Sequence, residues 1–196
     1  MYQNDAERKF ASRLLYLPVS KEGRVELWLT LRDQKPVSAI RLRKCFDGQT
    51  KGIKRLLKWL SDTRLEYVVD PKNNTVLHIS KNKNLAKRTA IILWSEKKKH
   101  IIEKGTLFGY PKNVTKIYAS FIDEKKWPGK SGALRVITKK SKNFPHYWAP
   151  YIRYVLRSAH AFQDSLIAKK WADIIRKEVP KLGYWYENEL KNSPIR

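Results

Sequence analysis

Hydrophobic and polar residues alternate in the first quarter of the chain. In the run 24–32, apolar residues stand at every second position from Val25 to Leu31, which is the period of a strand with one buried face. Two further β-prone runs, 14–19 and 37–43, lie on either side of it, separated by Ser-Lys-Glu-Gly and by Asp-Gln-Lys-Pro. This pattern predicts an antiparallel meander of three strands.

The spacing of apolar residues changes to three and four within 49–63, which predicts an amphipathic helix whose exposed face is basic. Beyond it, the runs 65–69 and 75–79 flank Asp-Pro-Lys-Asn-Asn, a turn sequence that predicts a hairpin. The run 89–94 is apolar almost throughout, which is typical of a central buried strand.

The second half of the chain has helical spacing. Gly105 is expected to end the first of these helices, and Pro180 stops the longest one. The stretch 125–150 is rich in Lys, Pro and Gly and predicts an extended loop around one short strand. The predicted helices cover residues 95–103, 114–124, 162–179 and 182–190.

Together these elements predict an α+β fold, with an antiparallel sheet and packed helices in the N-terminal half and a helical C-terminal region. A length of 196 residues is typical of one domain, 1–196. Within it, we expect residues 1–94 to be mainly sheet with one helix. Residues 95–196 are expected to be mainly helical, with the basic aromatic loop at 125–150.

The charge of the chain indicates its partner. It has 42 Lys and Arg against 18 Asp and Glu, a formal net charge of +24. A disordered basic tail is excluded, because 42% of the residues are hydrophobic and 12% aromatic. Such a charge on a folded body attracts phosphate polymers, so we expect nucleic acid to be the partner.

Composition also bears on location. A single cysteine, Cys45, excludes an intramolecular disulfide and every multi-cysteine zinc motif, and it fits a reducing compartment. The sequence has neither the apolar segment of a secretory leader nor a run of about 18 apolar residues that could span a membrane. The basic residues are spread along the chain, which does not favour binding to a membrane surface. We therefore expect a soluble cytoplasmic protein without a membrane partner.

Basic residues interleaved with aromatic rings are the strongest candidates for contacting nucleic acid, because cations bind phosphates and rings stack on bases. The alternative is that rings such as Trp148, Tyr151 and Tyr154 belong to the core and that the lysines are only solvated. The candidate binding residues are Arg41, Arg43, Lys51, Lys54, Arg55, Lys58, Lys97, Lys98, Lys99, Lys125, Lys126, Trp127, Lys130, Arg135, Lys139, Lys140, Lys142, His146 and Trp148.

A metal-dependent nuclease is the enzymatic alternative. Asp70 ends a predicted strand, and Glu96 and Lys98 follow another, so that an aspartate precedes Glu-x-Lys as in nucleases of the PD-(D/E)xK kind. Two carboxylates would hold Mg²⁺ and the lysine would stabilise the developing phosphorane charge. Only this alternative implies a cofactor, Mg²⁺. The same residues are also ordinary turn and helix-start chemistry. A metal-free pair of His100 and His146 is a third possibility.

The sequence contains no motif of the common nucleotide-hydrolysing or acyl-transfer enzymes. It contains no P-loop, no dinucleotide-binding glycine fingerprint and no nucleophile elbow. It also contains no helix-turn-helix, zinc-finger or RNP signature, so binding is expected to be largely independent of sequence, with RNA slightly favoured over DNA. An accessory or ribonucleoprotein-associated factor fits this description. A basic protein that docks an acidic surface of a nucleic-acid enzyme fits the composition as well.

The run from Glu103 to Pro111, Glu-Lys-Gly-Thr-Leu-Phe-Gly-Tyr-Pro, resembles the E-x-G-x-L-x-G-Y-P signature of an uncharacterised domain family of archaea and bacteria. That family commonly follows its proline with a cysteine pair, whereas this chain continues with Lys112-Asn113-Val114. Any role tied to those cysteines is therefore not carried over. The resemblance implies a folded helical segment here.

Overall fold

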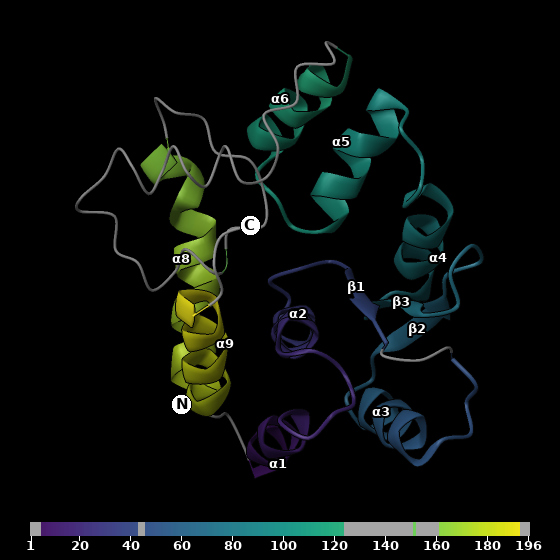
Figure 1. Cartoon of the computed structure of the whole chain (residues 1–196), viewed down its shortest axis with the longest axis vertical. Coiled ribbons are helices and arrows are strands. Elements are labelled where there is room, and N and C mark those ends of the chain that lie inside the picture. The colour runs from purple at the N-terminus through teal and green to yellow at the C-terminus, as the bar shows by residue number, and fades with distance from the viewer. Residues whose placement is uncertain (1–4, 43–45, 124–150, 152–160, 193–196) are drawn as a thin grey trace.

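The structure, a computed structural model, describes residues 5–42, 46–123, 151 and 161–192 (Figure 1). The fold is of the α+β class, as expected from the sequence, with its strands in the N-terminal half. None of the described helices combines the length and the apolar composition needed to cross a lipid bilayer. The described helices are α1 (Asp5–Leu14), α2 (Lys21–Leu31), α3 (Lys51–Asp62), α4 (Lys83–Ile92), α5 (Lys98–Leu107), α6 (Lys112–Asp123), α8 (Ala161–Glu178) and α9 (Pro180–Asn192); the strands are β1 (Ser38–Arg41), β2 (Glu66–Val69) and β3 (Val76–Ser80).

The sheet has the order β1-β3-β2, and both pairs of strands are antiparallel. The hairpin predicted from 65–69 and 75–79 is confirmed as β2 and β3. β1 lies on the other edge of β3, where Ile40 pairs with Leu77. The predicted meander of the first three runs is wrong, because only the third of them forms a strand of this sheet.

The two faces of the sheet are covered by different helices. Leu77 and Ile79 point into the main hydrophobic core, which includes residues of α2 and α3. Because side chains alternate along a strand, His78 points to the opposite face, where α4 contacts β2 and β3. Figure 1 shows the same arrangement, with α2 and α3 on one side of the sheet and α4 on the other.

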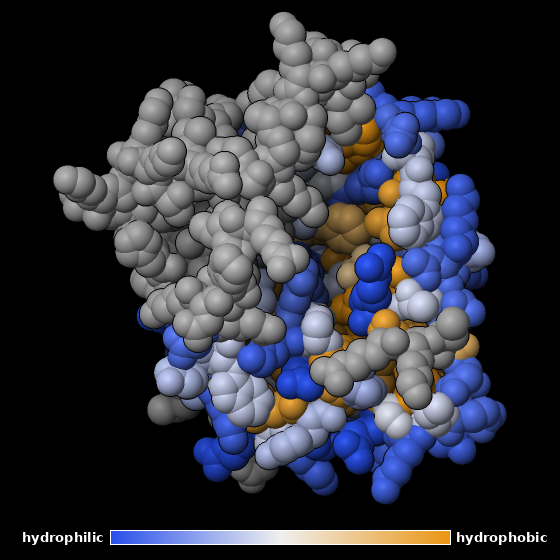
Figure 2. All heavy atoms as spheres, viewed as in Figure 1, coloured by the Kyte–Doolittle hydropathy of each residue, from blue (hydrophilic) through white to orange (hydrophobic). Residues whose placement is uncertain are grey.

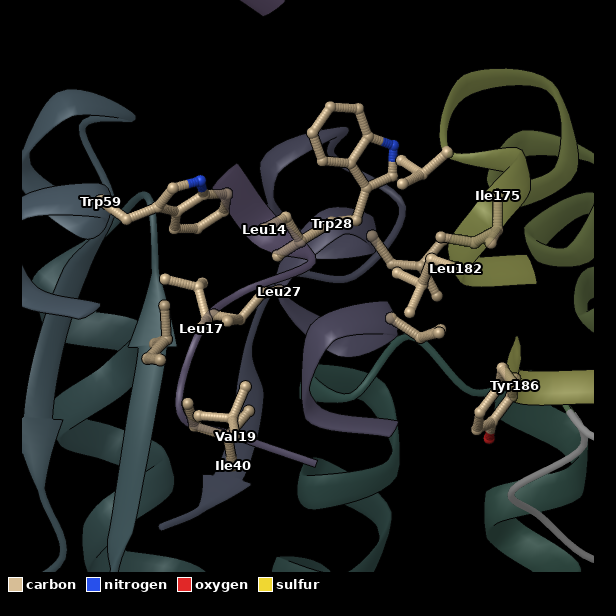
Figure 3. Packing of buried hydrophobic residues seen from close by; sticks show 14 of the residues in the cluster. Leu14, Leu17, Val19, Leu27, Trp28, Ile40, Trp59, Ile175, Leu182 and Tyr186 are labelled. Carbon is tan, nitrogen blue, oxygen red and sulfur yellow. The ribbon is translucent and has the colours of Figure 1, made fainter. Parts of the chain in front are cut away.

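The C-terminal helices complete the core of the N-terminal half. Ile175 of α8 and Leu182 and Tyr186 of α9 belong to the same buried cluster as Trp28 and Trp59 (Figure 3). The helices predicted at 162–179 and 182–190 are confirmed as α8 and α9, and the one predicted at 114–124 is confirmed as α6.

The strand predicted at 24–32 is instead the helix α2. This helix contacts β1, β3, α1, α8 and α9, so it is surrounded by other elements. Val25, Leu27, Trp28 and Leu29 are all buried. A helix that is apolar on most sides does not show apolar residues spaced three and four apart. The alternation of apolar and polar residues in this run is therefore a coincidence and not the signature of a strand. The sequence signal that was missed is Ser20, whose side chain accepts a hydrogen bond from the Gly23 N–H at 3.0 Å and caps the helix.

The strand predicted at 89–94 is also wrong, because most of this run is the second half of α4. Asn82 caps the helix by accepting from the Asn84 N–H at 2.9 Å. The small side chains of Ala86 and Ala90 are buried, which lets the helix lie close to the sheet. The described part of residues 1–94 therefore contains four helices and three short strands, not mainly sheet with one helix.

The Glu103–Pro111 run joins α5 to α6. α5 does not stop at Gly105 as predicted but continues to Leu107. A Cβ atom at Gly105 would lie 1.8 Å from Thr115 Cγ2, so glycine is required where α5 and α6 pack together. At Gly109, φ is +74° and a Cβ atom would lie 3.0 Å from the Gln34 carbonyl oxygen.

The tyrosine of the same run covers a buried cation. Lys35 is 2% exposed, and its Nζ lies 2.6 Å from a carboxylate oxygen of Glu26. The same Nζ lies 5.3 Å from the ring centre of Tyr110 and 4.7 Å from that of Trp171. The Gly-Tyr-Pro turn thereby fastens the α5–α6 pair to α2 and α8, which gives these motif residues a structural role.

Candidate nucleic-acid interface

Several chain segments meet at the end of the sheet where β2 turns into β3, which we call the turn end. β1 finishes there, because Arg41 pairs with Val76. The segment leading into α3 lies beside the turn, since the Phe46 N–H donates to the Asn74 carbonyl oxygen at 2.9 Å. α4 runs antiparallel to β3 and brings residues 93–97 to the same place.

A buried carboxylate joins two of these segments. Asp70 Oδ2 lies 2.8 Å from His78 Nε2, and both side chains are fully buried. The indole N–H of Trp94 donates to the same carboxylate, at 2.9 Å to Oδ1 and 3.1 Å to Oδ2. The backbone N–H groups of Lys72 and Asn73 each donate to Oδ1 at 2.9 Å. Asp70 therefore holds the β2–β3 turn and Trp94 together.

Hydrogen bonding and burial together determine the charge states of this cluster. Burial raises the pKa of Asp70, but the hydrogen bonds that the carboxylate accepts outweigh burial and hold the pKa below its usual value. Burial lowers the pKa of His78, and the neighbouring Asp70 only partly offsets this. At neutral pH the pair is thus a carboxylate and a neutral imidazole, which donates through Nε2–H.

Acidification is expected to destabilise the protein from about pH 6.5 downward. The pKa of His78 is lowered in the folded state, so the unfolded chain binds a proton at this histidine at a higher pH than the folded protein does. The contribution of neutral His78 to the free energy of unfolding is therefore complete above pH 6.5 and declines below it. Asp70 adds a loss of the same sign below its unfolded pKa of 3.8, as pH falls through its lowered folded pKa. For one proton, the free energy of unfolding should fall by up to about 1.4 kcal/mol for each unit by which the pH is lowered.

Urea unfolding between pH 5 and 8 measures this effect. His100→Gln is the control, because burial and then Lys99 and Arg88 also lower the pKa of His100. A slope that disappears in the control variant would assign the effect to His100, and an NMR titration of the His78 ring with a pKa above 6.5 would contradict the prediction outright.

The segment after α4 is held in place by its own contacts. Lys104 Nζ donates to the carbonyl oxygens of Leu93 at 2.9 Å and Ser95 at 2.8 Å. Ser95 Oγ also lies 2.7 Å from His100 Nδ1. These bonds attach the segment to α5, and the bond from Trp94 to Asp70 attaches it to the sheet.

Trp94 is 43% exposed, although its N–H is hydrogen-bonded to a buried carboxylate. The apolar run 89–94 predicts Trp94 at the end of a buried strand, so it is not among the predicted binding residues. The usable signal was the position of this tryptophan directly before Ser-Glu-Lys-Lys-Lys, an aromatic residue beside a basic run.

Exposed cations lie on the segments that meet at the turn end. Arg41 ends β1, Lys51 begins α3, Lys72 lies in the turn, and Lys97 and Lys99 follow Trp94; all are exposed. Within the part of the chain that the structure describes, no ion pair joins any of these five to an acidic side chain. Lys98 is exposed in the same segment, and the exposed acids here are Asp47 and Glu96.

At the opposite end of the sheet, the exposed Lys81 and Lys83 are paired with acids, whereas no ion pair in the described part of the chain includes the exposed Arg64. Lys81 lies 2.5 Å from Asp33, and Lys83 lies 3.8 Å from Glu66. At the C-terminal end of α3, Arg13 lies 2.6 Å from Asp62. A cleft of about 750 Å³ opens here, lined by both signs of charge and by apolar side chains. Uncompensated positive charge therefore lies at the turn end and along α3.

The predicted basic face of α3 is confirmed. Lys51, Lys54, Arg55 and Lys58 are all exposed and recur at intervals of three and four, so they form one stripe along the helix. Only Lys58 approaches an acid, at 4.0 Å from Asp62. Figure 2 shows hydrophilic residues along much of the margin of the described molecule, with apolar residues at the surface mainly beside the grey region.

The proposed nuclease residues are only partly brought together. Asp70 is linked to Trp94 and so lies near the segment that carries Glu96 and Lys98, but both of its oxygens accept hydrogen bonds from protein donors. Among the described residues, no three His, Cys, Asp or Glu side chains form a group that could hold a metal ion. The nuclease interpretation stays a prediction, and these contacts give Asp70 a structural role.

The predicted aromatic basic loop, 125–150, lies outside the described residues. Of its neighbouring rings, Tyr151 is described and is buried, with its ring 5.1 Å from that of Tyr186 in an edge-on contact, as the core alternative expected. The candidate residues that lie outside the described ranges are Arg43, Lys125, Lys126, Trp127, Lys130, Arg135, Lys139, Lys140, Lys142, His146 and Trp148.

Comparison with protein-family models, with curated proteins and with solved structures finds no match to this chain. The resemblance of Glu103–Pro111 to a family signature accordingly stays a prediction.

Proposed function

We propose that this protein binds nucleic acid through the phosphates of its ligand, which contact the turn end of the sheet and the basic face of α3. The observation that carries the proposal is the contrast between the two ends of the sheet. Lys81 and Lys83 at one end are paired with acids, whereas Arg41, Lys51 and Lys72 at the other end have no acidic partner in the described part.

Electrostatics favours this assignment. Exposed ammonium and guanidinium groups that have no carboxylate partner are partly compensated by counterions from solution. Binding of a phosphate backbone releases counterions, and this release favours the complex. Burial lowers the pKa of His100 most, and the charges of Lys99, Arg88 and Lys97 lower it further against the opposing charge of Glu103. Phosphate contacts carry no base information, so binding is largely independent of sequence.

RNA is the favoured ligand over DNA in this proposal, and the protein acts as an accessory or ribonucleoprotein-associated factor. These finer assignments rest on the composition and on the lack of any sequence-reading signature. A docking role on an acidic protein surface uses the same cations but does not require nucleotides, so the two functions predict different ligands.

Binding is expected to be strongly salt-dependent. If six to ten phosphates are contacted, the affinity for a labelled RNA or DNA oligonucleotide should fall by about 10³- to 10⁵-fold between 50 and 200 mM salt. Fluorescence anisotropy at a series of salt concentrations measures the slope of log K against log salt. A purified acidic protein or polyglutamate serves as a control for attraction to carboxylates.

Two results would oppose the proposal. A flat salt response, or no binding of oligonucleotides in dilute buffer, would exclude phosphate-driven binding. Equal affinity for polyglutamate and RNA would instead favour an acidic protein surface as the partner.

A further inference from the structure

Trp94 combines exposure with a fixed orientation. Its N–H edge points to the buried Asp70 carboxylate, while 43% of the residue remains exposed. An exposed aromatic side chain ordinarily loses rotamer freedom when a ligand binds to it. Here Asp70 and the contacts of the 93–97 segment have already restricted the ring. Binding to a ring that is already ordered costs less entropy.

A second apolar side chain extends this surface. Ile91 is 68% exposed, and it precedes Trp94 by three residues. Leu93, the C-cap of α4, still has helical dihedral angles, so Ile91 and Trp94 lie on neighbouring positions of one helical face. Two large exposed apolar groups side by side indicate a contact surface rather than isolated exposure.

Cations frame this apolar surface. Lys87 precedes Ile91 by one turn of α4, and Lys97 follows Trp94 by three residues. The strand register places Arg41 and Asp70 on either side of Val76, about 10 Å apart at two strand spacings, on the face that carries α4. The ring that bonds to Asp70 is therefore close to cations on more than one side.

We propose that Trp94 is a stacking platform for an unpaired base, with Ile91 beside it and with the turn-end cations holding the flanking phosphates. This inference rests on the proposed function and narrows it to single-stranded or looped nucleic acid. An aromatic face flanked by cations suits an unpaired strand, because a duplex buries its base faces and presents mainly phosphates.

The platform is tested with three probes on the full chain: a labelled 12-nucleotide RNA, the duplex of the same sequence, and inorganic polyphosphate. Polyphosphate offers phosphates without bases. Trp94→Ala is expected to weaken single-strand binding by about 5- to 150-fold, the usual range for one stacked base. Binding of duplex and of polyphosphate should change little. Ile91→Ala should shift single-strand binding in the same direction by a smaller factor.

A second measurement does not depend on a variant that could unfold. The chain is labelled with 5-fluorotryptophan, and the Trp94 signal is assigned by its loss in Trp94→Phe. The ¹⁹F resonance of Trp94 is expected to shift on addition of single-stranded RNA and to stay in place on addition of polyphosphate.

The outcomes separate this inference from the proposed function. If wild type binds neither RNA nor polyphosphate, the proposed function fails. If it binds both, but Trp94→Ala leaves the preference for single strands unchanged or the ¹⁹F signal moves equally with both ligands, the platform fails and phosphate-driven binding stands.

Discussion

Replacing Asp70 with alanine is expected to lower the free energy of unfolding by about 3 to 5 kcal/mol. The substitution leaves His78 Nε2–H without its acceptor in a fully buried site. It also strips an acceptor from the indole N–H of Trp94 and from two backbone N–H groups in the turn. Each unsatisfied buried donor costs about 1 to 3 kcal/mol.

Urea unfolding monitored by circular dichroism measures the loss. Glu66→Ala is a matched control, because it removes an exposed carboxylate of the same sheet that lies 3.8 Å from Lys83, a contact worth at most about 1 kcal/mol. Asp70→Asn should fall between the two, since it keeps one acceptor oxygen. Equal losses for Asp70→Ala and Glu66→Ala would show that the buried carboxylate does not hold the turn.

Neutralising the turn end is expected to reduce RNA affinity by roughly 10- to 100-fold at low salt and to lower the salt slope by about 2 to 3. The variant combines Lys51→Gln, Lys72→Gln and Lys97→Gln, which are exposed and have no acidic partner in the described part. Each lost phosphate contact removes somewhat less than one unit of slope.

The control variant removes the same charge from the opposite end, with Arg64→Gln, Lys81→Gln and Lys83→Gln. Both triple variants have the same net charge, so any difference between them reports position rather than total charge. Lys81 and Lys83 are paired with acids, and their neutralisation is expected to change affinity only a few-fold. Equal losses in the two variants would mean that binding follows net charge and that no interface exists at the turn end.

The candidate site was partly visible in the sequence. The basic stripe of α3 and the lysines at 97–99 could be identified, because helical spacing and charge runs are local properties. The position of Trp94 beside a basic run was visible as well, but its anchoring was not, since that depends on a hydrogen bond to a residue 24 positions away. Asp70 was identified as chemically distinctive, but only its contacts reveal that its carboxylate serves the protein's own donors.

The two misassigned helices, α2 and α4, have different physical origins for the error. α3 was predicted correctly because one face meets solvent and the other the core, which produces the helical period. α2 was mistaken for a strand because it lies among the sheet, α1, α8 and α9, and neighbours on most sides erase that period. In α4, Ala86 and Ala90 pack against the sheet, and their small side chains give little hydrophobic contrast.

The sequence by itself determined the α+β class, the hairpin of β2 and β3, the helices α3, α6, α8 and α9, and the excess of positive charge, because each follows from composition or from local periodicity. Only the tertiary structure decided which cations are paired with acids, which ends of the sheet they occupy, and how a tryptophan comes to be both anchored and exposed. Those properties depend on pairing between segments far apart in the chain, and local patterns carry no information about such pairing.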